Sequence, residues 1–204
     1  MEADIISQII RIRSIAEIGL LYSKDDYNID RYSELQRISH ELLGLITGEK
    51  IETVKNFFQS TTDYPTVKVD IRGMLLSGDK ILLVQEADNK WSLPGGWADI
   101  GYSPSEVIIK EFKEETGLDV TPLRLLAVLD KRKHRHPPQP TYVYKIVFLC
   151  KASSSALAKG FDIQGVEYFS IHDLPPLSED RILNSQLRML YTLATNDQQT
   201  TFFD

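Results

Sequence analysis

Residues 95–118 read GGWADIGYSPSEVIIKEFKEETGL, and this stretch carries the strongest structural signals in the chain. Residues 103–106, SPSE, have the spacing of a capping box, in which the serine and glutamate side chains each bind the other residue's main-chain amide. The proline within it suits the first helical position, and Gly117 suits the left-handed position that ends a helix. We therefore predict a helix over residues 104–116.

Three glutamates, Glu111, Glu114 and Glu115, lie on one edge of this predicted helix, within an arc of about 100°. Carboxylates this close repel one another, whereas Mg²⁺ and Mn²⁺ favour such oxygen ligands and share them with substrate phosphates. An acidic edge alone is usually a solvated surface, but the helix cap, the glycine stop and the preceding Pro-Gly-Gly turn favour a metal site. The neighbouring arc is apolar and is predicted to pack on the core; it contains Ile108, Ile109 and Phe112.

The stretch resembles the Nudix box, G-x5-E-x7-R-E-U-x-E-E-x-G-U, in which U is a bulky aliphatic residue. Two positions depart from this pattern, because Tyr102 replaces the first glutamate and Lys110 replaces the arginine. In the family those two groups brace the loop against the helix, so the resemblance implies a replaced brace rather than a lost active site. The fixed positions that match without insertion are Gly96, Glu111, Glu114, Glu115, Gly117 and Leu118, with Phe112 at an aliphatic position.

The resemblance implies an α+β protein whose residues 66–204 form a Nudix α/β/α sandwich with a mixed sheet. It implies an enzyme in which water attacks the diphosphate of a nucleoside diphosphate linked to another group, with Mg²⁺ or Mn²⁺ as cofactor. By the same resemblance the three glutamates are catalytic residues and metal ligands, and the Gly95 carbonyl is a further ligand. Glu114 or Glu115 would be the general base. Two acids of the second half, Asp162 and Glu167, are additional candidates for the base, although each also fits an ordinary loop or strand-edge position.

Four side chains outside the glutamate cluster are candidates for substrate binding: Arg72, Trp97, Lys133 and His136. Arg72 stands in an otherwise apolar strand, where it either caps a strand edge or, by the resemblance, binds a phosphate. The ring of Trp97 could meet a base or a choline-like cation. Lys133 and His136 belong to the basic run 131–136, which is either a solvated loop or a grip for phosphates.

Residues 1–65 differ from the rest of the chain by their helical period, which predicts helices over about 5–21, 29–45 and 51–58. This module holds 11 acidic and 7 basic residues, which argues against a DNA-binding helical domain. We expect it to form the contact of a homodimer, and it is similar to an extension found in a subgroup of Nudix enzymes. The residues predicted to face inward on the second helix are Leu35, Ile38, Leu42 and Leu43.

From residue 67 onward the pattern changes to alternating strands and turns. Residues 77–79, Ser-Gly-Asp, read as a hairpin turn. The predicted strands cover 67–76, 80–85, 123–130, 142–150 and 165–170, and a closing helix is predicted over 179–194.

The composition of the chain argues against several classes of protein. The chain has 204 residues, 42% of them hydrophobic, enough for one core and a smaller module. Its single cysteine, Cys150, cannot form an internal disulfide and reads as a core residue, and no apolar run approaches the roughly 18 residues of a membrane span. The N-terminus lacks an export signal, so we expect a cytoplasmic protein without a membrane partner. The net charge of −6 argues against general affinity for nucleic acid.

The substrate is the least determined part of the sequence-based interpretation. The helical extension and the His-Pro-Pro-Gln-Pro junction after the basic run are similar to CDP-choline pyrophosphatases, so CDP-choline or a related CDP-alcohol is the expected substrate, with CMP and a phosphorylated product. Two other substrates stay open, ADP-ribose and the end of an RNA strand held by residues 131–136. An alternative of a different functional class is a non-catalytic Nudix domain that senses nucleotides. The intact glutamates argue against this alternative.

Overall fold

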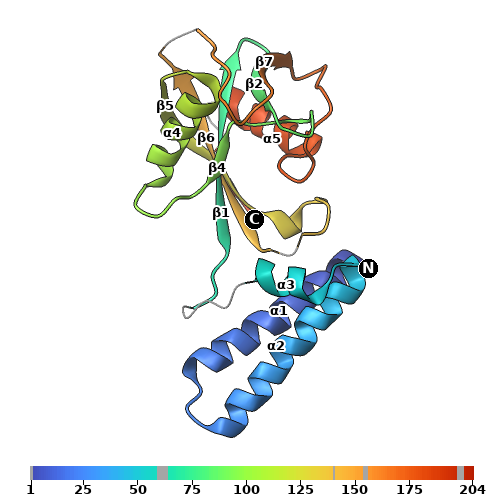
Figure 1. Ribbon diagram of the computed structural model, residues 1–204. Coiled ribbons are helices and arrows are strands. Elements are labelled where there is room, and N and C mark those ends of the chain that lie inside the picture. The colour runs from blue at the N-terminus through green and yellow to red at the C-terminus, as the bar shows by residue number, and fades with distance from the viewer. Residues whose placement is uncertain (1, 59–63, 140, 154–155, 197–199) are drawn as a thin grey trace. The chain divides into compact units, whose positions relative to one another are not determined.

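The structure of the chain is a computed structural model that describes residues 2–58, 64–139, 141–153, 156–196 and 200–204. The chain divides into two compact units (Figure 1). The first consists of Met1–Val67 with Pro138–Thr141, and the second of Lys68–Pro137 with Tyr142–Asp204.

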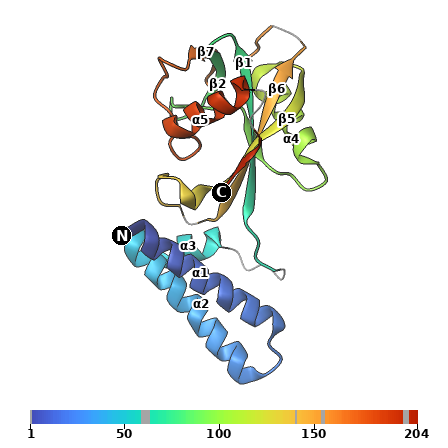
Figure 2. The ribbon, with the colours of Figure 1, turned by 180° about the vertical axis from the view of Figure 1, so that it is seen from behind.

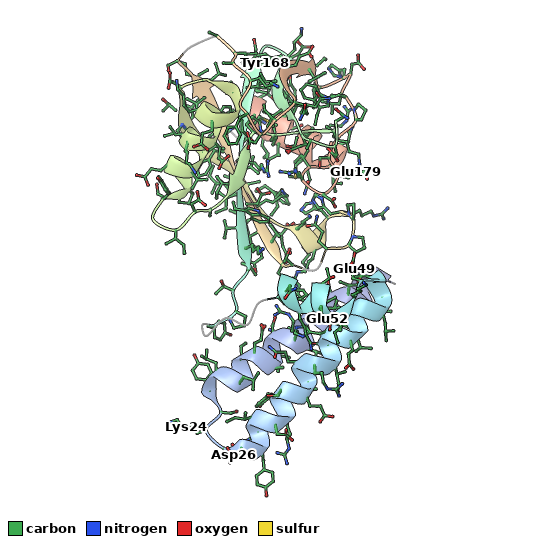
Figure 3. All side chains as sticks on the ribbon, viewed as in Figure 1. Lys24, Asp26, Glu49, Glu52, Tyr168 and Glu179 are labelled. Atoms are coloured by element: carbon green, nitrogen blue, oxygen red, sulfur yellow. The ribbon has the colours of Figure 1, made fainter. Side chains whose placement is uncertain are left out.

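The first unit is helical, as predicted. Its helices are α1 (Glu2–Tyr22), α2 (Asp26–Thr47) and α3 (Ile51–Phe57). The first two form a hairpin whose connection is marked by Lys24 and Asp26 in Figure 3. Asp25 caps α2 by accepting from the Asn28 amide, and Gly48 ends the helix in the left-handed conformation. None of the helices in the described ranges is long and apolar enough to cross a bilayer.

The prediction that Leu35 and Leu42 face inward was wrong for a single copy of the chain. Each is 38% exposed, whereas Leu43 is only 1% exposed. Each helix of this small unit buries only the side that faces the other helices. The remaining apolar residues of α1 and α2 therefore stay on the surface. Those exposed in this way include Ile5, Ile12, Ile15, Leu21, Leu35, Leu42 and Leu45.

The second unit is built on a mixed sheet in the order β3-β2-β1-β6-β5-β8, with β4 added to β1 and β7 added to β2. The β1–β6 and β5–β8 pairs are parallel and the others are antiparallel. The Gly78 turn joins β1 to β2, as predicted. The strands are β1 (Lys68–Ser77), β2 (Lys80–Gln85), β3 (Trp91–Ser92), β4 (Gly95–Trp97), β5 (Val120–Asp130), β6 (Val143–Ala152), β7 (Gly165–Ser170) and β8 (Phe202–Phe203).

Two helices cover the sheet from opposite sides, α4 (Pro104–Thr116) and α5 (Asn184–Thr195), as Figures 1 and 2 show. Buried side chains of α4, among them Phe112, pack with Cys150 of β6 in one core cluster. Leu187 and Leu190 of α5 pack on the other face of the sheet in a second cluster. The α/β/α sandwich is therefore confirmed, and Cys150 is a core residue.

Three local expectations differ from the structure. The last helix begins at Asn184 rather than 179, because Ser178 accepts from the amide of Ile182 and closes a turn first. Ile109 is exposed and Val107 takes its place in the core, since α4 is rotated slightly from the predicted face. The edge strand β8 was not predicted, because two phenylalanines contain no alternating run that would signal a strand.

Candidate active site

Helix α4 begins and ends as its sequence predicts. The amide of Glu106 donates to Ser103 Oγ at 3.3 Å, and the Ser103 amide donates to Glu106 Oε2 at 2.7 Å. Gly117 adopts the left-handed conformation, and its amide donates to the Lys113 carbonyl. The capping box fixes the start of α4 close behind β4, so the later turns of the helix lie beside the glycine pair.

The glycine pair makes room for two of the carboxylates. The amide of Gly95 donates to Glu115 Oε2 at 2.9 Å. Gly95 has a φ of 137°, and a Cβ there would lie 2.1 Å from the Ile71 carbonyl oxygen, so only glycine fits. A Cβ on Gly96 would come within 2.8 Å of Glu111 Oε1. Both glycines thus let the main chain approach the carboxylates closely.

The carboxylates lie in an environment that disfavours their negative charge. Burial raises the pKa of Glu115 to about 8, although the Arg72 charge and the Gly95 amide act in the opposite direction. Burial also raises the pKa of Glu111; Lys110 opposes this shift, and the charges of Glu114 and Asp162 add to it. The nearby charges of Arg72 and Lys110 do not offset the effect of burial on these two carboxylates.

A divalent cation fits this donor set. The oxygens are hard ligands, and a cation would offset the repulsion and desolvation that raise the two pKa values. In the described ranges no three acidic, histidine or cysteine side chains converge into a closed cage. Mg²⁺ does not need such a cage, because it keeps several waters and takes one or two carboxylates together with substrate phosphates.

The brace between loop and helix uses different residues from those of the usual box. Lys110 Nζ donates to Asp99 Oδ2 at 2.9 Å and lies 5.7 Å from the ring centroid of Tyr102. The two departures from the box are therefore in contact, and Asp99 supplies the carboxylate that Tyr102 lacks. Sequence reasoning missed Asp99, although an acid in the loop three residues before Tyr102 was a usable signal.

Arg72 lies in the middle of the domain. Its strand β1 has neighbours on both sides, so the suggestion that Arg72 caps a strand edge was wrong. Arg72 Nε donates to Asp70 Oδ1 at 2.8 Å, and Nη1 donates to the Leu93 carbonyl at 2.9 Å. The guanidinium is buried, and its Nε and Nη1 donors are directed at protein acceptors.

Trp97, by contrast, is 52% exposed at the end of β4. Its neighbour in the sheet is Asp70 of β1, and Lys68 Nζ lies 5.4 Å from the ring centroid. The ring therefore contacts a cation and has free surface for another group.

The basic run is more compact than a solvated loop. Lys131 is buried in a short 3-10 turn, η1 (Lys131–Lys133), whereas Lys133 is exposed. Arg132 pairs with Asp130. The Nδ1 atom of His136 donates to the carbonyl of Glu179, labelled in Figure 3, at 2.6 Å. The exposed positive charge along this run is consequently discontinuous.

His136 has an unusual environment for a histidine. Burial lowers the pKa of its ring to about 4, although the hydrogen bond to the Glu179 carbonyl opposes the shift. Among the described atoms, its Nε2 is buried without a hydrogen-bond partner. Because Nδ1 carries the hydrogen, Nε2 offers a lone pair that can accept from a donor.

The two additional base candidates have different surroundings. Asp162 is exposed, and its charge contributes to the raised pKa of Glu111. Glu167 is exposed on β7, opposite Leu83 of β2. In the part of the chain that the structure describes, no contact joins Glu167 to the other carboxylates.

Two family profiles match the chain. Residues 66–190 match the family profile of the NUDIX domain. Residues 3–58 match a UDP-X-like, N-terminal oligomerisation domain.

Individual relatives cover most of the chain. A putative ADP-ribose pyrophosphatase of Bacillus subtilis is 44% identical over 95% of this chain and 94% of its own length. Among solved structures, a UDP-X diphosphatase is 32% identical, covers 100% of this chain and 99% of its own, and has a TM-score of 0.65. An ADP-ribose pyrophosphatase from Streptococcus suis is 39% identical, covers 68% of this chain and 100% of its own, and has a TM-score of 0.63.

Proposed function

The chain belongs to the Nudix family of hydrolases acting on nucleoside diphosphate-linked groups, and we propose that it cleaves ADP-ribose or a UDP-linked sugar with the help of Mg²⁺ or Mn²⁺. The observation that carries this proposal is the Glu115 carboxylate held by the Gly95 amide beside Glu111. The names of relatives, ADP-ribose pyrophosphatase and UDP-X diphosphatase, support ADP-ribose and a UDP-linked compound ahead of other substrates.

Each residue of the site has a role in this reaction. Glu111, Glu114 and Glu115, with the Gly95 carbonyl, would hold the metal. When bound, the metal neutralises diphosphate oxygens and lowers the pKa of a water. Glu114 or Glu115 accepts the proton of the attacking water, with Asp162 as a further candidate. Water attacks phosphorus, the bond to the bridging oxygen breaks, and a nucleoside monophosphate and a second phosphorylated compound leave.

CDP-choline is the second candidate substrate, and Trp97 is the observation that favours it. Its half-exposed ring contacts the Lys68 ammonium, which shows that a cation can lie on its face. A choline headgroup could use the same interaction, worth about 0.5–1 kcal/mol at an exposed site. RNA is less favoured, since Lys131 is buried and Arg132 is paired.

We also propose that the chain functions as a homodimer formed through its helical unit. Helices α1 and α2 expose many aliphatic side chains, and an apolar surface of this kind is typical of an interface. The oligomerisation domain that residues 3–58 match supports the same assignment.

A substrate panel tests the enzymatic proposal. The protein is incubated with Mg²⁺ or Mn²⁺ and, separately, ADP-ribose, UDP-glucose, CDP-choline or a short RNA, and products are identified by chromatography and phosphorus NMR. We expect the highest kcat/KM for ADP-ribose or UDP-glucose, and complete loss of activity with EDTA. A preference for CDP-choline would favour the second candidate, and no turnover of any compound would contradict the enzymatic function.

A further inference from the structure

Three charged side chains are buried together at the centre of the second unit. Asp70 and Arg72 lie on β1, and Lys145 lies on β6; their exposed fractions are 4%, 5% and 1%. Asp70 is directly opposite Lys145 in the parallel β1–β6 pair. Since side chains alternate along a strand, all three point to the same face of the sheet.

The contacts run from this triad to the glycine pair. Asp70 accepts from Arg72 Nε through Oδ1 and from Lys145 Nζ through Oδ2. Arg72 Nη1 donates to the Leu93 carbonyl at 2.9 Å. Two residues later, the Gly95 amide donates to Glu115. A single chain of hydrogen bonds and covalent bonds therefore joins Lys145 to Glu115.

The loop Leu93–Gly95 is fixed at each of its residues. The Leu93 carbonyl binds Arg72, the Pro94 carbonyl accepts from the Gly73 amide at 3.0 Å, and the Gly95 amide binds Glu115. Of these contacts, only the one from Arg72 depends on a side chain of β1. Arg72 therefore helps to fix the Leu93 carbonyl, which also accepts from Ser92 Oγ at 3.2 Å.

Stability alone is a poor explanation for such a triad. Buried ions lose their hydration, and well-packed apolar residues of similar volume are often as stabilising or more so. Phosphate binding does not explain the triad either, because the Arg72 side chain is 6% exposed and its Nε and Nη1 donors are used within the protein. The triad does provide a guanidinium, that of Arg72, which is held in one orientation and binds the loop that carries Gly95.

We propose that Arg72 is a positioning residue for the Gly95–Glu115 contact, and that Asp70 and Lys145 hold the Arg72 guanidinium in the orientation this requires. The inference rests on the proposed function of the carboxylate site. None of the three residues contacts substrate. Their effect is on where Glu115 and the Gly95 main chain lie when substrate is bound.

The principal test uses Arg72→Lys, which keeps the charge but loses the planar fork that reaches both Asp70 and Leu93. Hydrogen exchange of the Gly95 amide is measured by NMR, and kcat and KM are measured with ADP-ribose and Mn²⁺. We expect exchange at Gly95 to be at least ~10-fold faster and kcat at least ~10-fold lower, with KM within ~3-fold of wild type. Lys145→Met should change Gly95 exchange and kcat in the same direction but by less. Lys145→Arg, which keeps the positive charge, should behave like wild type.

The control is Ser170→Ala on β7, which removes a hydrogen bond to Asp79 in the β1–β2 turn and leaves α4 and the Leu93–Gly95 loop unchanged. It should lower the unfolding midpoint without changing Gly95 exchange or kcat. A KM increase of ~10-fold or more in Arg72→Lys with kcat unchanged would mean that Arg72 contacts substrate and would overturn the proposal. Unchanged Gly95 exchange would overturn it as well. Because exchange needs no turnover, this readout decides the inference even if ADP-ribose is not hydrolysed and the proposed function fails.

Discussion

Glu115 shows how much of this site depends on single residues. Its carboxylate is buried, and it accepts from an amide that only glycine can place there. The raised pKa of about 8 means that the side chain is ready to accept positive charge from a metal or a proton. At the residue scale the site is therefore a set of acids whose negative charge a bound cation or a proton would neutralise.

Replacing Glu115 by glutamine removes this charge with little change in shape. We expect Glu115→Gln to lower kcat/KM by at least ~10²-fold, because the side chain would lose both its metal-ligand and its base role. Steady-state kinetics with ADP-ribose, or with the best substrate of the panel, measure the effect. The matched control is Glu106→Gln, since glutamine can still complete the capping box. Near-normal activity of Glu115→Gln would refute its role.

His136 makes the stability of the second unit depend on pH. Its folded pKa of about 4 lies below the ordinary value of 6.5, so the unfolded chain takes up the proton first as the pH falls. Stability from this group is therefore fully present above pH 6.5 and is lost progressively between pH 6.5 and 4, by at most about 1.4 kcal/mol per pH unit. Partial exposure of the ring reduces this amount.

Urea unfolding at pH 7, 6 and 5 tests this expectation, followed by the fluorescence of Trp91 and Trp97, both in the second unit. His136→Gln can still donate to the Glu179 carbonyl but cannot titrate. We expect the variant to lose less stability than wild type on going from pH 7 to pH 5. The exposed His172→Gln serves as the control and should follow wild type. Parallel curves for wild type and His136→Gln would contradict the assignment.

At the scale of elements, the capping box of α4 is the device that aligns the acids with the glycine pair. Ser103→Ala removes one side of it and should destabilise the second unit by about 1 kcal/mol. Ser105→Ala, at an exposed position in the first turn, is the matched control and should have little effect. The same urea titration measures both variants, and equal losses would argue against a specific cap.

The C-terminal strand β8 fixes the basic run. Its neighbour Asp204 accepts from the Asp130 amide at 2.7 Å and lies 3.0 Å from His134 Nε2. The Asp204 amide in turn donates to the Val128 carbonyl. The residues after β5 are thereby held in place from the far end of the sequence.

Asp204→Ala should therefore loosen residues 131–136. Losing two hydrogen bonds of about 1 kcal/mol each should speed amide exchange in this run by up to roughly 30-fold. Hydrogen-exchange mass spectrometry measures this. Thr201→Val is the control, because it removes only the bond to the Leu125 carbonyl and leaves the Asp204 contacts intact. Unchanged protection of 131–136 in Asp204→Ala would show that β5 alone orders the run.

At the scale of the whole molecule, the proposed dimer can be tested on the exposed aliphatic residues of the helical unit. The double variant Leu35→Glu with Leu42→Glu places charge on that surface and should convert the dimer to monomer. Light scattering coupled to size exclusion measures the mass. Ser33→Glu adds the same kind of charge at an exposed polar position of α2 and should leave the mass unchanged. A wild-type mass of one chain would refute the dimer.

The sequence by itself determined the α4 helix with both of its ends and the order of most helices and strands, while the reaction class came from its resemblance to the Nudix box. These features depend on local chemistry: capping, left-handed glycine, alternation and the spacing of carboxylates on one helix. Such signals act within a few residues and remain readable without the fold.

Only the tertiary structure decided the surroundings of Arg72, the partner of Lys110, the two-residue strand β8 and the exposure of Leu35 and Leu42. Each depends on segments far apart in the sequence, as when Asp70 meets Lys145 across two parallel strands. Pairing register and burial are properties of the assembled sheet, and a polar residue in a strand gives no local sign of which partner will neutralise it. For that reason the capped helix that carries the glutamates was predictable, whereas the Asp70–Arg72–Lys145 network was not.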